Sequence, residues 1–265
     1  MSEPETIVDI GANLAHRSFH ADLKAVIQRG FGAGVRTLVV TGSNVENSHE
    51  AQRIAAGYAG QIFSTAGVHP HDSRNCGADT IARLRELAAA NEVVAIGECG
   101  LDFNRNYSPR PDQEKWFAAQ VDLAEELQMP LFLHERDARE RFVEMLGAHR
   151  KSVPAVLHCF TGTREDLKAY LDLDLYIGVT GWICDERRGL HLRELIRDIP
   201  ANRLMIETDA PFLLPRSMPN KPKDGRNEPA FLPHVLRAVA DALGKPVAEV
   251  AQATTRTAKE FFRID

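Results

Sequence analysis

Short runs of β-branched and apolar residues recur along nearly the whole chain, and segments with helical spacing of apolar residues lie between them. Continuous apolar strands that alternate with helices are typical of a parallel sheet covered by helices. Eight such repeats within about 250 residues match the size of a (β/α)₈ barrel. The predicted strands are residues 6–10, 37–41, 62–66, 93–96, 131–133, 155–157, 175–179 and 204–206.

A doubly wound open sheet is the main alternative fold. It would place a glycine-rich GxGxxG turn after the first strand, but residues 11–16 read GANLAH. We therefore predict the barrel. No linker rich in proline, glycine or serine divides the chain, so we expect a single domain over residues 1–265. The predicted helices are residues 21–33, 45–59, 80–90, 111–128, 137–149, 164–171, 187–197, 232–243 and 247–261.

The composition limits the cellular setting and the partners. The four cysteines form no CxxC pair, which argues against a disulfide framework and a structural zinc site. Residues 1–15 show no signal-peptide pattern and no apolar run approaches 18 residues, so we expect a cytoplasmic protein without membrane contact. The net charge of −5 means that any polyanionic partner must bind a local basic patch.

Metal-ligand residue types repeat where the predicted strands end. In a barrel of this kind the chemistry lies at the carboxyl ends of the strands. Imidazole and carboxylate together are a common ligand set for a catalytic divalent ion, so their repetition at equivalent ends predicts a metal site. The residues are His69 and His71 after the third strand, Glu98 after the fourth, His134 after the fifth, His158 after the sixth, and Glu207 and Asp209 after the eighth. Asp102 either binds or orients a group, or begins a loop.

Seven motifs in order, GVHPHD, GECGLDFNRN, HERD, HCFTG, GWICDERRG, ETDAPFLLPR and RNEP, resemble the TatD family of metal-dependent deoxyribonucleases within the amidohydrolase-like barrels. The likeness covers roughly residues 6–262. It implies a TIM barrel, a divalent metal and 3′–5′ exonuclease action on single-stranded DNA and RNA, in DNA repair or degradation. The metal-ligand motifs of the family fall on Glu98, His134, His158 and Asp209.

The chain departs from most of that family after the first strand. The usual motif there is DxHxH, whereas this chain has Gly11 and Asn13 in place of the two histidines. A glycine offers no ligand and an asparagine offers only a neutral carbonyl oxygen, so a two-metal centre is not expected. The remaining site suits Mg²⁺ better than Zn²⁺, with Mn²⁺ as a further alternative.

Phosphodiester hydrolysis needs a Lewis acid, an activated water and help for the leaving oxygen. We assign metal binding to Glu98, His134 and His158, and give Asp209 the role of a ligand or general base. His69 would hydrogen-bond the phosphate or protonate the leaving oxygen. Glu207 is either part of the site or a buried partner of an arginine.

Basic and aromatic residues follow several strand ends and could form a rim for phosphates and bases. We expect Arg136, Arg216, Lys221 and Lys223 to contact substrate, and the loop 216–226 also carries Arg226. Base stacking is predicted for Phe103, Tyr107, Trp182 and Phe212, although each could instead pack locally. The expected enzyme is a monomer.

Two other classes of function use the same residues. An amidohydrolase-like deacylase or esterase, acting on an aminoacyl-tRNA or a small amide or ester, would share the strand-end ligands. A protein that binds metal or nucleic acid without catalysis would share them too. The basic rim favours the nuclease over the first alternative, and the intact ligand set favours it over the second.

Overall fold

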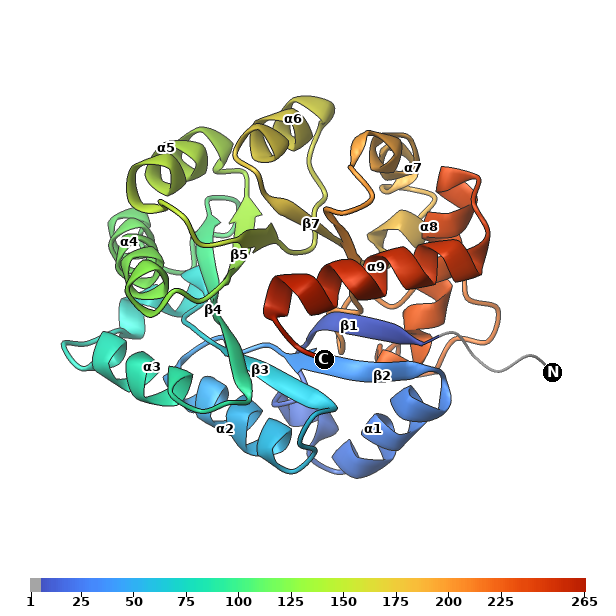
Figure 1. Ribbon diagram of the computed structural model, residues 1–265, viewed down its shortest axis with the longest axis horizontal. Helices are drawn as coiled ribbons and strands as arrows, with labels where there is room; N and C mark the ends of the chain where they lie inside the picture. The colour runs from blue at the N-terminus through green and yellow to red at the C-terminus, as the bar shows by residue number, and fades with distance from the viewer. Residues whose placement is uncertain (1–5) are drawn as a thin grey trace. The chain divides into compact units, whose positions relative to one another are not determined.

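The computed structural model describes residues 6–265, and within them eight strands alternate with helices (Figure 1). The strands form one sheet in the order β1 to β8, with parallel pairing throughout β3–β6 and between β7 and β8. The predicted (β/α)₈ class is confirmed. The strands are β1 (Ile7–Ala12), β2 (Val35–Val40), β3 (Ile62–Ala66), β4 (Val93–Asp102), β5 (Leu131–Arg136), β6 (Ala155–Leu157), β7 (Tyr176–Val179) and β8 (Leu204–Ile206).

All of the predicted helices form, although α7 is shorter than predicted and a 3₁₀ turn completes it. No helix within residues 6–265 is long and apolar enough to cross a membrane. The α-helices are α1 (Leu23–Gly32), α2 (Val45–Ala56), α3 (Thr80–Ala88), α4 (Arg110–Leu127), α5 (Arg139–His149), α6 (Arg164–Asp172), α7 (Leu190–Leu195), α8 (Leu232–Leu243) and α9 (Val247–Phe262). The 3₁₀ turns are η1 (Arg17–Phe19), η2 (Pro70–Asn75), η3 (Gly181–Cys184), η4 (Ile196–Asp198) and η5 (Pro229–Phe231).

The described chain divides into two compact units, which we describe separately. Unit 1 holds the described residues up to Val39 together with Cys159–Leu167 and Ile177–Asp265. Unit 2 holds Val40–His158 and Lys168–Tyr176. Strands β3 to β6 therefore belong to unit 2, and β1 and β8 belong to unit 1.

The last two helices of unit 1, α8 and α9, pack on each other and on its strands. The apolar residues of α8 recur at helical spacing and are buried, and α8 packs against α9. Helix α9 in turn packs against β1 and β8, and Figure 1 shows it lying beside β1. These contacts anchor β1, which contains Asp9, and β8, which Asp209 follows.

Unit 2 has a core of stacked aromatic rings between its helices. The rings of Phe117 in α4 and Phe142 in α5 lie parallel, with their centroids 5.3 Å apart. Tyr170 meets Phe142 edge-on at 5.9 Å and is fully buried. Its hydroxyl donates a hydrogen bond to Glu135, the residue after His134 in β5. The helices thus support the strand that carries a candidate ligand.

Strand β4 extends beyond the predicted run 93–96. The expectation that the strand stops before Glu98 is wrong, because it continues to Asp102 and all of its residues are buried. The pairing of β4 with β5 changes register between Gly97 and Cys99, on either side of Glu98. Glu98 therefore lies at an irregularity within the strand and not at the end of the strand.

Two glycines make this irregular pairing possible. Gly97 and Gly100 have φ values of +133° and +150°, which side chains rarely allow. A Cβ atom at Gly97 would lie 2.1 Å from the carbonyl oxygen of Phe132, and one at Gly100 would lie 1.8 Å from that of His134. The backbones of β4 and β5 thus approach too closely for any side chain at either position.

Candidate metal centre

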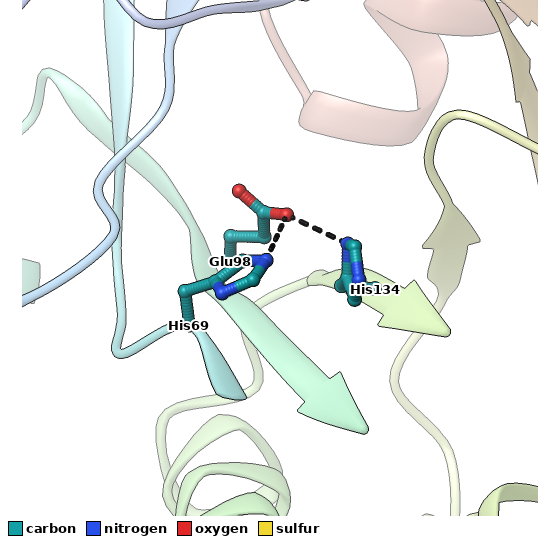
Figure 2. A group of neighbouring side chains, drawn as sticks. All are labelled: His69, Glu98 and His134. Atoms are coloured by element: carbon teal, nitrogen blue, oxygen red, sulfur yellow. Dashed lines mark ion pairs between the residues drawn. The ribbon is translucent and has the colours of Figure 1, made fainter. Parts of the chain in front are cut away.

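Four side chains of unit 2 converge near the ends of neighbouring strands. His69 precedes η2 shortly after β3, Glu98 lies at the irregularity of β4, His134 lies within β5, and His158 follows β6 directly. Figure 2 shows the rings of His69 and His134 both facing the same oxygen of the Glu98 carboxylate. Glu98 and His158 are buried, and the other two are largely so.

One oxygen of Glu98 is the centre of this cluster. Its Oε1 lies 2.8 Å from Nε2 of His158, 3.1 Å from Nδ1 of His134 and 3.2 Å from Nε2 of His69. The His134 and His158 nitrogens are themselves 3.4 Å apart. Three of the four sequence-predicted metal ligands are therefore brought together, and His69 joins them.

The spacing fits a divalent cation. Ligand bonds of about 2.0–2.2 Å place neighbouring ligand atoms about 3 Å apart around an octahedral ion and about 3.4 Å apart around a tetrahedral one. Glu98 Oε1, His134 Nδ1 and His158 Nε2 form a triangle with sides of 2.8, 3.1 and 3.4 Å. These three atoms, which we call the ligand triangle, are spaced as neighbours on one ion would be.

The electrostatics of the cluster favour a bound cation as well. Burial alone would raise the pKa of the Glu98 carboxyl, but the facing rings of His158, His69 and His134 hold it well below its usual value. Burial would likewise lower the pKa of His134, yet Asp102 and Glu98 raise it. An ionised carboxylate in a buried position is stable only with a positive partner, which a metal ion provides.

His69 differs from the atoms of the ligand triangle because its nitrogen that faces the cluster carries a hydrogen. Its Nδ1 accepts a hydrogen bond of 3.0 Å from the backbone amide of His71, and this contact caps the first turn of η2. A neutral ring whose Nδ1 accepts must carry its hydrogen on Nε2. Burial, opposed by Glu98, lowers the pKa of His69 to about 4, so the ring is neutral at physiological pH. His69 therefore presents an N–H donor and not a free ligand nitrogen.

Sequence reasoning left Asp102 open and gave His71 no specific role. The structure pairs them: Nε2 of His71 lies 2.6 Å from Oδ2 of Asp102, which is fully buried. Asp102 is thus the buried last residue of β4, and a turn follows it directly. The signal in the sequence was the HxH spacing of His69 and His71 after a strand, but nothing in it linked His71 to a carboxylate 31 residues away.

The remaining predicted site residues after β8 belong to unit 1. Asp209 Oδ1 accepts a hydrogen bond of 2.9 Å from the side-chain amide of Asn13, so Asn13 orients a carboxylate with its nitrogen. Glu207 is fully buried, and its Oε1 accepts a hydrogen bond of 2.6 Å from the backbone amide of Cys159. The sequence missed both contacts.

The predicted substrate-binding cations occupy different settings. Arg136 is the last residue of β5 in unit 2. In unit 1, Lys221 and Lys223 are exposed, and Arg216 is half exposed with its guanidinium 3.8 Å from Asp185. Their contacts with substrate stay predictions.

Arg226 does not join the basic rim expected for the loop 216–226. Its two terminal nitrogens lie 2.9 and 2.8 Å from the two carboxylate oxygens of Asp22, and its guanidinium covers the ring of Phe19. A second arginine, Arg29, is paired in the same way with Glu228. The RNEP motif therefore fastens its loop to α1, and its charges are already neutralised.

Comparison with protein families shows which family the chain belongs to. A family model described as TatD related DNase matches residues 8–263. This chain belongs to the TatD-related DNase family. The family predicted from the sequence motifs is confirmed. Two curated relatives are named 3′–5′ ssDNA/RNA exonuclease TatD: one from Shigella flexneri serotype 5b is 53% identical, and one from Escherichia coli K12 is 52% identical. Each alignment covers 97% of this chain and 98% of the relative.

Solved structures agree with the TatD-related fold. A TatD homolog from Escherichia coli K12 matches with a TM-score of 0.87 at 25% identity, covering 98% of both chains. A hydrolase of the TatD family from Entamoeba histolytica matches with the same TM-score at 24% identity, covering 98% of this chain and 99% of that one. The strand order and the alternating helices are therefore those of a known fold.

Proposed function

We propose that this chain is a metal-dependent 3′–5′ exonuclease that hydrolyses phosphodiester bonds of single-stranded DNA and RNA. The observation that carries the proposal is the ligand triangle of Glu98, His134 and His158. It occurs in a chain about half identical, over nearly its full length, to proteins named as such exonucleases. The polarity and the strand type follow from those relatives.

The residues divide the chemical work between them. Glu98, His134 and His158 would hold the ion, which supplies a Lewis acid for a phosphoryl oxygen. In the structure Nε2 of His69 faces Oε1 of Glu98 at 3.2 Å, and with substrate bound its hydrogen would pass to a phosphate or leaving oxygen. Because the ring is neutral, His69 acts as a hydrogen-bond donor that stabilises developing negative charge. Asp209, as a further ligand or the general base, stays a prediction from the sequence.

We propose Mg²⁺ as the physiological ion. The absence of histidines at Gly11 and Asn13 removes the nitrogen ligands of a second metal and supports a site completed by oxygen donors. Two histidines in the ligand triangle also suit Mn²⁺ or Zn²⁺. Metal analysis of protein purified without chelators, followed by turnover measurements with each ion added back, distinguishes the three.

An exposed aromatic side chain beside the cluster supports the choice of a single-stranded substrate. Tyr107 is 55% exposed, and its ring meets that of His71 edge-on at 4.7 Å. His71 in turn lies 4.2 Å from the ring of His69. A base stacked on Tyr107 would gain roughly 1–3 kcal/mol, and only an unpaired base is free to do so. Phe103 is less suited to stacking, since Arg110 covers one face of its ring at 4.2 Å.

The experiment uses single-stranded DNA labelled at its 5′ end, incubated with purified protein in Mg²⁺ and, separately, in EDTA. We expect a ladder that shortens from the 3′ end in Mg²⁺ and an intact strand in EDTA. A phosphorothioate cap at the 3′ end should protect the strand, whereas a 5′ cap should not. Cleavage of a circular strand at the rate of a linear one would replace the exonuclease by an endonuclease, and hydrolysis of esters alone would favour the deacylase alternative.

We further propose that the enzyme is a monomeric cytoplasmic protein that acts in DNA repair or degradation. The composition supports the location, and the substrate of the relatives supports the role. Sedimentation at micromolar concentration tests the monomer. Survival of a deletion strain after DNA damage, with and without the wild-type gene restored, tests the role in repair.

A further inference from the structure

A buried carboxylate outside the ligand triangle faces two histidines at once. Asp102 ends β4 and is fully buried. Its Oδ2 lies 2.6 Å from Nε2 of His71 and 3.7 Å from Nε2 of His134. The first separation is a hydrogen bond, and the second is the distance of an ion pair. Asp102 therefore acts electrostatically on a ligand of the cluster without belonging to it.

The position of Asp102 is fixed independently of the histidines. Its Oδ1 accepts hydrogen bonds from the backbone amides of Asn104 at 3.0 Å and Arg105 at 2.8 Å. The side chain of Gln113 accepts from the backbone amide of Asp102 at 2.8 Å and donates to its carbonyl oxygen at 3.1 Å. The backbone therefore fixes the position of the Asp102 carboxylate, and the carboxylate in turn holds the rings of His71 and His134.

His134 lies between two carboxylates. Its Nδ1 faces Glu98 and His158, and its Nε2 is buried without a hydrogen-bond partner within residues 6–265. The carboxylate of Asp102 at 3.7 Å attracts a hydrogen on Nε2. A hydrogen there leaves the lone pair on Nδ1, and Nδ1 is the atom that completes the ligand triangle.

We propose that Asp102 is a positioning residue of the metal centre: it keeps the hydrogen of His134 on Nε2, directs Nδ1 to the cation, and holds His71 beside that ring. The inference rests on the metal centre of the proposed function. Carboxylates behind ligating histidines fix the tautomer and the ring orientation, and their loss typically weakens metal binding by about 10–100-fold. The residue acts through His134 and not on the substrate.

The test replaces Asp102 by asparagine, which keeps the volume and the acceptor for the two backbone amides. Titration of full-length protein with Mn²⁺, followed by electron paramagnetic resonance, should show affinity about 10–100-fold below wild type. At saturating Mn²⁺, kcat should fall while the KM for a labelled oligonucleotide stays unchanged. Asp122→Asn is the matched control, because Asp122 is 3.0 Å from His149 in an exposed pair on α4 and α5. It should bind Mn²⁺ like wild type.

A spectroscopic readout keeps the proposal open to refutation even if Asp102→Asn does not fold. Nitrogen-15 spectra of histidine-labelled, Mg²⁺-loaded wild type report which nitrogen of His134 carries the hydrogen, with His134→Gln assigning the signal. We expect it on Nε2, and a hydrogen on Nδ1 would overturn the proposal. His71→Gln should weaken Mn²⁺ binding less than Asp102→Asn, since the contact of Asp102 with His134 remains.

The two proposals fail in different ways. Wild-type Mn²⁺ affinity in Asp102→Asn, or an equal loss in Asp122→Asn, would remove the role of Asp102 and leave the exonuclease untouched. Conversely, wild-type protein that binds Mn²⁺ but cleaves no oligonucleotide would remove the exonuclease and leave the positioning role intact. Metal binding and tautomer are measured without substrate, so the outcomes do not depend on each other.

Discussion

Glu98 in unit 2 and Asp9 in unit 1 are both fully or almost fully buried carboxylates on strands, and their pKa values move in opposite directions. Burial raises the pKa of Asp9 to about 7, and the nearby charge of Glu207 adds to the effect. Burial would do the same to Glu98, but the imidazoles around it lower its pKa well below the usual value. The comparison separates the effect of the surrounding side chains on the pKa of a buried acid from the effect of burial itself.

The number of hydrogen bonds does not explain the difference. Asp9 accepts from the hydroxyl of Thr208 at 2.6 Å and from the backbone amides of Thr208 and Gly11 at 2.9 and 3.3 Å. All of these donors are neutral, so they do not offset the loss of hydration of a full charge. Glu98 faces rings that can become charged or hold a cation. A buried acid lined by neutral donors retains a proton, whereas one lined by imidazoles is suited to a metal.

The largest effect is expected from removing the ligands themselves. Glu98→Gln, His134→Ala and His158→Ala should each lower Mg²⁺-dependent cleavage by more than about 100-fold, since even residues behind ligands have effects of 10–100-fold. Turnover of a labelled oligonucleotide and Mn²⁺ titration measure the loss, with circular dichroism as the control for folding. Wild-type turnover in any folded variant would contradict the metal-binding role that distinguishes the surroundings of Glu98 from those of Asp9.

Asp9→Asn tests the other side of the comparison. A folded pKa of about 7 against 3.8 for the unfolded chain means that unfolding releases a proton between those values, so wild type loses stability as the pH rises from about 4 to 7. Asparagine resembles the protonated acid and avoids this loss. We expect urea unfolding to show little difference near pH 4 and a gain of up to about 4 kcal/mol at pH 8. A variant less stable than wild type at pH 8 would refute a protonated Asp9.

His69→Ala sharpens the contrast within unit 2 by separating a donor from ligands. Loss of the Nε2 hydrogen should lower kcat by about 100-fold, the effect of removing one donor to developing charge. Mn²⁺ affinity should stay at the wild-type value, because Nδ1 accepts from the amide of His71 and Nε2, the nitrogen that faces the cluster, therefore carries the hydrogen. His49→Ala, an exposed histidine on α2, is the control. A large loss of Mn²⁺ affinity in His69→Ala would make His69 a ligand.

The smallest effect is expected from a comparison of exposed and paired cations in one loop of unit 1. Exposed Lys221 and Lys223 are free to meet phosphates, whereas Arg226 is held by Asp22. Reversing both lysine charges to glutamate should flatten the slope of log affinity against log salt by about 0.7 for each lost phosphate contact, and raise KM with kcat little changed. Arg226→Ala should leave the slope unchanged and lower the unfolding temperature instead. Equal slopes in both variants would contradict the difference.

Much of the fold followed from local pattern, because each apolar run reports its own burial. The strands at 62–66, 155–157 and 204–206 form as predicted. The predicted fourth strand ended at residue 96, where the apolar run meets Gly97, and Gly100 follows shortly after. Their cause, the close approach to β5, is a contact with residues more than 30 positions away. A glycine in the sequence does not show whether it ends a strand or lets another backbone come near.

The residues of the candidate site were likewise predictable from local pattern, but their partners were not. Residue types at strand ends predicted His69, Glu98, His134 and His158, because parallel strands bring those ends together. Pairings could not be predicted, since the sequence shows a charge but not its partner. Asp22 and Arg226, for example, are 204 residues apart. The pairing of Asp102 with His71, which underlies our further inference, is of this kind.

The cap that His69 places on η2 has a consequence for experiments. Since the ring is held by its own backbone neighbour, chelation should leave this group, which we propose contacts the substrate, aligned. Enzyme stripped of metal would then act as an inert receptor for the end of a nucleic acid strand. Crystals grown in EDTA with an uncleavable or natural oligonucleotide should therefore capture the scissile phosphate beside His69, in a wild-type protein without any disabling mutation.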